Sequence, residues 1–337
     1  MPIHTVLGPI DADRLGPTSM HEHLLIDATV WQEPSAEAPP EERVSLRSRG
    51  YLQWNPLALR DNLILDDEEQ AIEELAAARA AGCSGIVDLT VIGLGRRIDG
   101  VKRIAAAVDL HVMVGCGFYL HDSHPDWVEA AGVDELASFL IGELREGVED
   151  SGVRPALIGE IGTSAPFTER EKKVLRAAGR AGVETGAAVN VHLDRRQPGA
   201  LEAIAILCEE GMAPERIICS HLDERLDWGY HREVAETGAI LEYDTFGQEF
   251  YFGPTDKNPS DVERLQFVAR LLEDGRRDQL VLGCDIWVKV ATARYGGMGY
   301  EHLMKRIVPA LTADLGLAAA DVEAMTVETP RRLLDRP

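Results

Sequence analysis

The chain has 337 residues, 45% of them hydrophobic and 27% charged, and a formal net charge of −23. One (β/α)8 barrel with insertions would use this length, and the composition is that of a globular protein with a large core. The acidic net charge repels nucleic-acid phosphates and anionic membrane surfaces. We therefore expect neither nucleic acid nor a membrane as a partner, and the charge favours a small-molecule substrate.

The N-terminus and the cysteines bear on the cellular compartment. The opening MPIHTVLGPIDADRLG has no basic-then-apolar signal pattern, and no apolar run approaches the ~18 residues of a membrane span. The five cysteines are widely spaced and form no C-x-x-C pair, which favours buried, reduced side chains over disulfides or a zinc ribbon. We therefore expect a cytoplasmic protein.

Short β-rich segments alternate with amphipathic helices along the whole chain. Residues 66–82 predict a helix with acidic side chains in its first turn and Gly82 at its C-terminal cap. Residues 168–182 predict another, opened by a capping box of Thr168 and Glu171. The alternation indicates an α/β fold, a closed (β/α)8 TIM barrel that forms one domain over residues 1–337. The predicted strands are Thr18–His23, Gly85–Thr90, His111–Gly117, Ala156–Ile161, Ala187–His192, Ile217–His221, Ala239–Tyr243 and Leu280–Asp285.

Two irregular segments stand out as extended βα loops 1 and 7. Glu33–Asn62 follows the first predicted strand, and Thr245–Ser260 follows the seventh. In a barrel these loops lie at the end where active sites are built. They are either substrate walls or plain solvated connections, and the sequence leaves that choice open.

Histidine and carboxylate residues recur at the ends of the predicted strands. His21 and His23 are two apart on the first strand, so both side chains point to the same face. An isolated H-x-H pair is a weak signal, and a single buried His or Asp usually bonds to the backbone. Six such residues at strand ends suit two borderline divalent ions such as zinc, with a carboxylate as the bridge. The other four are Glu160, His192, His221 and Asp285.

These residues carry a resemblance to the phosphotriesterase family of the amidohydrolase superfamily, in its branch of phosphotriesterase-related proteins. The opening TVLGPIDADRLGPTSMHEHL resembles the family's first signature. Later blocks follow in family order from about residue 5 to residue 334: IVDLTVIGLGR, LIGEIGTS, VNVHL, ICSHLD, LEYDTFGQEFY, RYGGMGYEHL and ETPRRLL. Such a colinear set is more specific than any one motif.

The resemblance implies which residue holds which ion. His21, His23 and Asp285 would hold the more buried metal, His192 and His221 the more exposed one, and Glu160 would bridge both. The best-known phosphotriesterases use a carboxylated lysine as the bridge. Glutamate at this position is typical of the related branch and supplies a carboxylate directly.

Several further residues are candidates with plainer alternatives. Asp285 and Asp223 are the expected proton carriers, although Asp223 reads equally well as a helix N-cap. Tyr119 is a substrate contact by resemblance, or else a packed aromatic at the barrel rim. Lys289 and Arg294 follow the eighth strand and are expected either to bind an anionic substrate group or to form loop ion pairs.

The expected activity is hydrolysis by a hydroxide shared between two divalent ions, Zn²⁺ by preference, with Mn²⁺, Co²⁺ and Fe²⁺ as alternatives. The glutamate bridge favours carboxylic esters or lactones. The alternatives are an amidase for an N-acyl amino acid or amine, an organophosphate triesterase, and a non-catalytic metal-containing binding protein. The resemblance also implies a homodimer.

Overall fold

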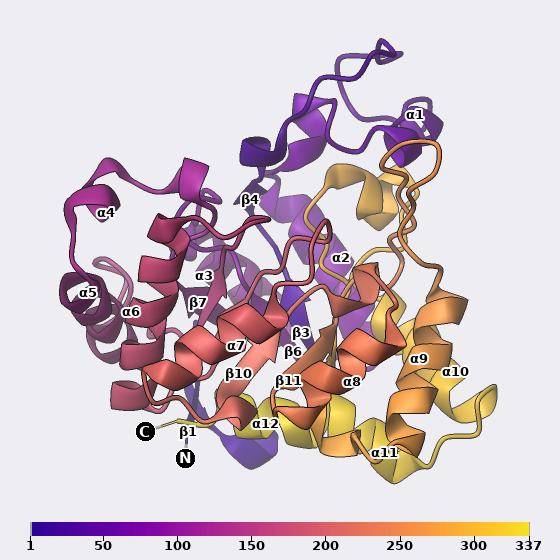
Figure 1. The fold of residues 1–337 in the computed structure, drawn as a ribbon. Helices are drawn as coiled ribbons and strands as arrows, with labels where there is room; N and C mark the ends of the chain where they lie inside the picture. The colour runs from indigo at the N-terminus through magenta and orange to yellow at the C-terminus, as the bar shows by residue number, and fades with distance from the viewer. Residues whose placement is uncertain (1, 337) are drawn as a thin grey trace.

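The computed structural model describes residues 2–336 and shows eight parallel strands in a nearly closed barrel surrounded by helices (Figure 1). Hydrogen bonding joins the strands in the order β12-β11-β10-β9-β8-β7-β6-β3. The fold is thus the predicted TIM barrel of amidohydrolase type. Its strands are β3 (Thr18–Glu22), β6 (Gly85–Asp88), β7 (His111–Cys116), β8 (Leu157–Ile161), β9 (Val189–Val191), β10 (Ile217–Cys219), β11 (Ile240–Tyr243) and β12 (Leu280–Leu282).

The helices follow the strands in the expected rhythm. The predicted capping box of Thr168 and Glu171 is present, and α2 has the predicted acidic first turn, with Asp67 as an N-cap that accepts a hydrogen bond from the Gln70 amide. The helices that cover the barrel are α2 (Glu68–Ala80), α3 (Ile98–Ala107), α4 (Asp126–Ala130), α5 (Val133–Glu146), α6 (Glu169–Thr185), α7 (Ala200–Glu209), α8 (Trp228–Glu236), α9 (Asp261–Glu273), α10 (Val308–Ala313), α11 (Ala319–Glu323) and α12 (Thr329–Leu334).

The first and last strands are joined mainly by a buried side chain. The Glu22 carboxylate accepts hydrogen bonds from the backbone amides of Cys284 and Ile286, at 3.1 and 3.0 Å. The Asp285 amide donates to the His21 carbonyl at 3.0 Å. A Cβ at Gly283 would lie 2.9 Å from that same carbonyl oxygen, so this close approach requires glycine.

The barrel interior changes character along each strand. Its lower layer is apolar and includes Ala188, Ile218 and Ile240, closed from below by Leu333 and Leu334. Two residues further along β9 and β11, the interior becomes polar, because side chains two apart in a strand share a face. There Asn190 and Ser220 both donate to the Glu242 carboxylate, at 2.7 and 2.8 Å. The candidate metal ligands lie above this polar layer.

Both predicted long loops rise above the upper end of the barrel (Figure 1). The first is anchored by a two-stranded pairing of β4 (Ile26–Asp27) with β5 (Ile64–Leu65) and contains helix α1 (Arg49–Trp54). The second meets it, since the Tyr251 amide donates to the Gln53 carbonyl at 2.8 Å. The rings of Trp54 and Tyr251 stack with centroids 4.2 Å apart. The two loops therefore form one surface.

The lower end carries the N-terminal hairpin of β1 (Pro2–Thr5) and β2 (Gly8–Asp11), with both chain termini nearby (Figure 1). All five cysteines have free thiols, and four of them are buried. Across residues 2–336, no helix has both the length and the apolar character needed to cross a membrane.

Candidate metal centre

Six residues from the upper ends of the strands bring their donor atoms together. In one group, His23 Nε2 lies 3.2 Å and His21 Nε2 3.8 Å from Asp285 Oδ1. In the other, His192 Nδ1 and His221 Nε2 lie 2.8 and 2.9 Å from Glu160 Oε1. The structure thus brings together the six residues that the sequence pattern indicated, in the two groups that the family resemblance implied.

Glu160 faces both groups. Its Oε1 lies 3.7 Å from His21 Nε2, and its Oε2 lies 4.0 Å from His23 Nε2. A Cβ at Gly115 on β7 would lie 1.8 Å from the carbonyl oxygen of Gly159, so β7 must carry glycine where β8 presents this carboxylate. The position suits a carboxylate that bridges two ions.

The donor set fits metal ions by its own chemistry. His221 Nε2 and His192 Nδ1 are 2.9 Å apart, and both face the same carboxylate oxygen. His21 Nε2 is buried with no hydrogen-bond partner among the described residues. Buried nitrogen lone pairs directed at one another are costly unless a cation lies between them. Two divalent ions would satisfy the groups, with His21, His23 and Asp285 holding one, His192 and His221 the other, and Glu160 both.

A second layer of carboxylates orients these histidines. Asp244 lies 3.0 Å from His21 Nδ1 through Oδ2 and 3.1 Å from His221 Nδ1 through Oδ1. Glu242 lies 3.1 Å from His21 Nδ1. Because Nδ1 is engaged in each ring, Nε2 is the atom presented to a metal. Sequence reasoning missed Glu242 and Asp244, although the LEYD run of the seventh strand carries both two residues apart.

The electrostatics follow from burial and neighbouring charge. Burial alone would raise the pKa of Glu160, but the adjacent His192 and His21 hold it well below its usual range. Burial would lower the pKa of His21, whereas Asp244, Glu160 and Glu242 raise it well above its ordinary value. The centre is thus a buried cluster of carboxylates and imidazoles in which each group shifts the pKa of its neighbours.

The backbone is also unusual at two of the ligands. His221 and Asp285 adopt left-handed conformations, with φ of 58° and 47°. Such conformations are uncommon for residues other than glycine and persist only where surrounding contacts impose them. Here the His221 amide donates to the Asp244 carboxylate, and the Asp285 amide donates to the His21 carbonyl. The second layer and the barrel closure therefore set the direction of both ligands.

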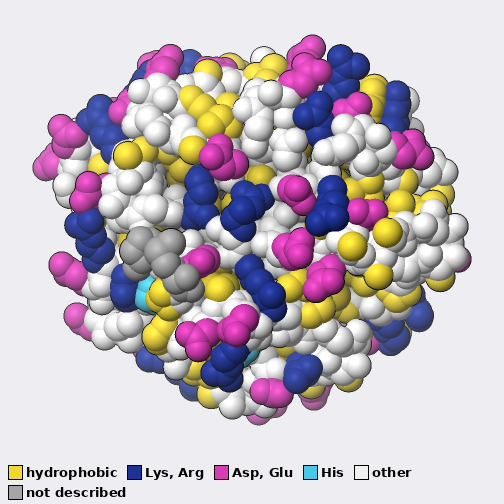
Figure 2. Space-filling view, turned by 90° about the horizontal axis from the view of Figure 1, so that it is seen from below, with side chains coloured by type: hydrophobic (Ala, Val, Ile, Leu, Met, Phe, Trp, Pro, Cys, Tyr) yellow, Lys and Arg dark blue, Asp and Glu magenta, His cyan; other side chains and the backbone are white. Residues whose placement is uncertain are grey.

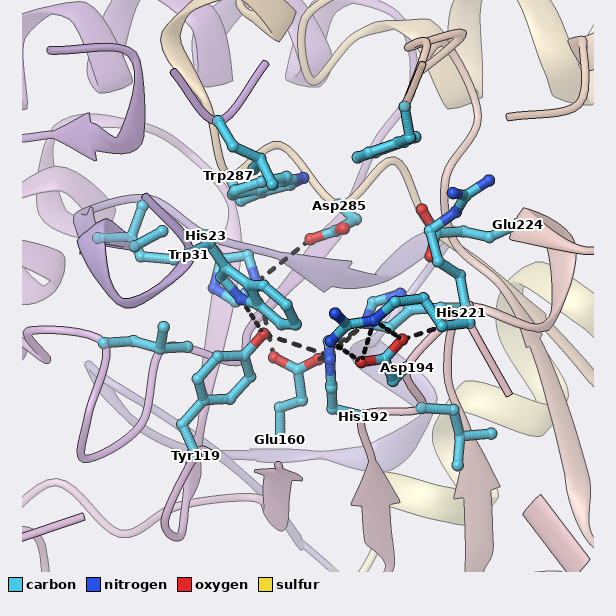
Figure 3. Close-up of a pocket in the computed structure, with 18 of the residues that line it drawn as sticks. His23, Trp31, Tyr119, Glu160, His192, Asp194, His221, Glu224, Asp285 and Trp287 are labelled. Atoms are coloured by element: carbon cyan, nitrogen blue, oxygen red, sulfur yellow. Dashed lines mark hydrogen bonds and ion pairs between the residues drawn. The ribbon is translucent and has the colours of Figure 1, made fainter. Parts of the chain in front are cut away.

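A cavity of about 280 Å³ opens directly above these ligands (Figure 3). Both long loops contribute to its wall, through Glu33 and Leu57 from the first and Phe252 and Asp256 from the second. Of the two sequence alternatives for these loops, the structure thus supports substrate walls.

Aromatic side chains form one side of the cavity. The Tyr119 hydroxyl accepts a hydrogen bond from Trp31 Nε1 at 2.9 Å and lies 3.3 Å from His192 Nδ1. Burial, reinforced by Glu160, raises the pKa of Tyr119 well above its ordinary value, so the phenol keeps its proton. Trp31 and Trp287 line the cavity as well, and neither was singled out from the sequence. The feature of the sequence that could have identified them is their position, since each closely follows a strand that carries candidate metal ligands.

The two basic residues predicted to bind substrate lie outside the cavity. Lys289 pairs with Asp61 at 2.7 Å, and Arg294 pairs with Asp67 and Glu73 at 3.0 and 3.1 Å. Neither basic residue lines the cavity, so the structure supports the ion-pair alternative for both.

Asp223 is also removed from the cavity. Its carboxylate is buried against Arg264 Nε at 3.0 Å and accepts from the amides of Asp244 and Thr245. It is not a helix N-cap either, because Asp227 caps α8. The structure gives Asp223 the role of holding the turn that carries Asp244.

Charged groups at the cavity wall were likewise missed. Arg195 forms two hydrogen bonds to Asp256, at 2.7 and 2.9 Å, and Arg196 pairs with Asp194. All four residues line the cavity. The sequence signal was faint, because the DRR run after the fifth strand looks like an ordinary solvated turn.

Comparison with known proteins places this site in context. The profile described as "Phosphotriesterase family" matches residues 1–334. An N-acetyltaurine hydrolase of Danio rerio is 36% identical, with 98% of this chain and 97% of that protein aligned. A resiniferatoxin-binding protein from Rhodobacter sphaeroides has a TM-score of 0.95 at 36% identity, with 99% of this chain and 95% of that one covered. A lactonase from Listeria monocytogenes has a TM-score of 0.82 at 26% identity, with both chains fully covered. The chain belongs to the phosphotriesterase family and is a metal-dependent hydrolase of that family.

Proposed function

We propose that the protein hydrolyses the amide bond of a small N-acylated amine that carries an acidic group. The observation that carries this proposal is the cavity itself, which sets the metal-ligand groups beneath an aromatic wall and two arginines. It is supported by 36% identity to an N-acetyltaurine hydrolase over nearly the whole of both chains. This revises the ester or lactone preference drawn from the glutamate bridge, because amidases are found among relatives aligned over the full chain.

The chain's own residues supply binding and proton transfer. Arg195 and Arg196 lie at the cavity wall in ion pairs with Asp256 and Asp194, and an acidic substrate group that shares or displaces those carboxylates gains charge-assisted hydrogen bonds. The Tyr119 phenol is protonated and donates to an oxygen of the acyl group. Two divalent ions held by His21, His23, Asp285, His192, His221 and Glu160 would polarise the acyl carbonyl and lower the pKa of the attacking water. Asp285 accepts the proton of that water and returns it to the departing nitrogen, which an amide requires because an amine anion is a poor leaving group.

The metals we propose are two Zn²⁺ ions, because four imidazole nitrogens and two carboxylates suit zinc's ligand preference. Metal analysis of the protein as purified should give about two equivalents, dominated by zinc. The Glu160→Ala variant should retain less than half of that amount, since it loses the carboxylate that faces both groups of candidate ligands.

The test of the substrate is a comparison of kcat/KM on the metal-loaded protein. N-acetyltaurine and N-acetyl amino acids should be hydrolysed at least about tenfold more efficiently than lactones and neutral esters of similar size. The Arg195→Gln variant should raise KM for the anionic amides about tenfold while leaving a neutral N-acetyl amine unaffected. Arg232→Gln, which breaks only an exposed pair with Glu236, is the matched control.

A lactonase is the second candidate, favoured by the Listeria monocytogenes structure at 26% identity. A kcat/KM for lactones above that for every amide tested would establish it in place of the amidase. Phosphotriester hydrolysis faster than both would overturn the two proposals together.

A further inference from the structure

A second cavity, of about 320 Å³, lies at the end of the barrel opposite the metal centre. The turn between β1 and β2, Lys102 of α3 and the loop of residues 151–154 that precedes β8 line it. Figure 2 views this lower face, where basic side chains lie among acidic ones despite the net charge of −23. No acidic side chain is among the described residues that line the cavity.

Among the described residues, the cations at this cavity have no carboxylate partner. Within residues 2–336, neither Lys102 nor Arg154 nor Arg336 takes part in an ion pair, although acidic residues outnumber basic ones by 57 to 34. The Lys102 ammonium group makes one long hydrogen bond, 3.4 Å to the Ser151 carbonyl. By contrast, the buried cations Arg96 and Arg264 each pair with a carboxylate.

Two guanidinium groups are held together beside the cavity. Arg154 Nε donates to the Leu144 carbonyl at 3.0 Å, and Arg336 Nη2 donates to the same oxygen at 2.8 Å. Arg336 is fully buried, and its pKa is lowered to about 10 by that burial and by the charge of Arg154. Two like charges thus share one acceptor, and within residues 2–336 neither has a carboxylate partner to offset it.

A buried imidazole completes the wall. His4 lines the cavity with 6% of its surface exposed, and its Nε2 has no hydrogen-bond partner within the described chain. Burial, together with the charges of Arg336 and Arg154, lowers the pKa of His4 to about 4. The cavity is therefore a built, cation-lined site with an unsatisfied polar group.

We propose that this cavity binds a small tetrahedral oxyanion, either inorganic phosphate or the phosphate group of a small monoester. The two terminal nitrogens of Arg154 make no hydrogen bond within residues 2–336, so its guanidinium fork is free to bind two phosphate oxygens while Lys102 supplies a point charge. The cavity volume exceeds that of a water-sized site and leaves room for the organic part of a monoester. This inference does not depend on the amidase proposal, because the site lies at the other end of the barrel.

The test is calorimetric titration of the metal-loaded protein at constant ionic strength, with inorganic phosphate and glycerol 3-phosphate as probes. Lys102→Gln and Arg154→Gln should weaken the binding of at least one probe about tenfold or more, the loss expected for one charge-assisted hydrogen bond. Arg232→Gln, which removes an exposed cation paired with Glu236, should bind as the wild type does. All three variants should keep wild-type kcat/KM, which separates this site from anion binding at the metal centre.

The two probes distinguish the sources of the ligand. Binding of phosphate alone assigns the site to the free ion, and tighter binding of glycerol 3-phosphate assigns it to a phosphorylated metabolite. The proposal is overturned if neither probe binds. It is also overturned if Lys102→Gln, like the control Arg232→Gln, binds both probes as the wild type does. Lys102 is half-exposed and makes only the one long hydrogen bond within the described chain, so its variant tests the site even if Arg154→Gln does not fold.

Discussion

At the scale of single residues, His231 is a buried imidazole outside the metal centre whose charge state is set by its contacts. Nε2 lies 3.0 Å from the Arg225 carbonyl and donates to it, and Nδ1 lies 2.6 Å from the Tyr243 hydroxyl. Burial lowers its pKa from 6.5 to about 4. The folded protein therefore holds the ring neutral through the range in which the unfolded chain takes up a proton.

The consequence is a loss of stability on acidification. Above pH 6.5 neither state binds the proton, so His231 contributes no pH dependence. Between pH 6.5 and 4 only the unfolded state binds it, and stability falls as the pH falls, by about 2 kcal/mol at pH 5. The free energy of unfolding, measured with denaturant, should fall between pH 7.5 and pH 5 in both proteins. The fall in His231→Gln should be smaller than that in the wild type by about 2 kcal/mol. Equal decreases in both proteins would show that His231 is protonated in the fold.

At the scale of elements, the two long loops act as one wall because an aromatic stack joins them. Trp54, 47% exposed, stacks on Tyr251 with an angle of 6° between the rings. An aromatic pair contributes about 1 kcal/mol, so Trp54→Ala should let the loops separate and raise KM about three- to tenfold. The unfolding midpoint should change little, because loops of this kind open without global unfolding.

The matched control for this prediction is Trp127→Ala. Trp127 is 43% exposed and contacts Phe118 and Phe139, away from both loops. Steady-state kinetics and limited proteolysis within residues 46–57 provide the measurements. If Trp127→Ala raised KM as much as Trp54→Ala does, the stack between the loops would have no specific role.

At the scale of the whole molecule, we expect the stability of the barrel to depend on metal ions that neutralise its upper interior. The six candidate ligands are all buried, and their donor atoms face one another. Ions present at about a thousand times their dissociation constant add roughly 4 kcal/mol to the folded state. Chelation should therefore lower Tm by about 6 °C in a chain of this size. Glu160→Ala should show less than a third of that shift, and an equal Tm with and without chelator would refute metal-dependent stability.

Much of the fold and of the site was predictable from sequence because strands obey a local rule. Each apolar run that ends in His, Glu or Asp places that residue at the upper end of a parallel strand, where all strand ends meet. His192 and Asp285 were identified in this way. Contacts that depend on distant partners were not predictable. Asp223 is engaged by Arg264, 41 positions further along the chain, and no local pattern reveals that pairing.

The amino-acid sequence by itself determined the barrel, its strand ends and the six candidate ligands, since period and residue type act within a few positions of one another. The tertiary structure alone decided what those ligands face. It placed Asp244 between His21 and His221 and joined loops some two hundred residues apart into one wall. Within residues 2–336 it also left Lys102 and Arg154 without acidic partners. The physical reason is that hydrogen bonds, ion pairs and stacking act through space, and only the closed barrel brings these side chains within their range.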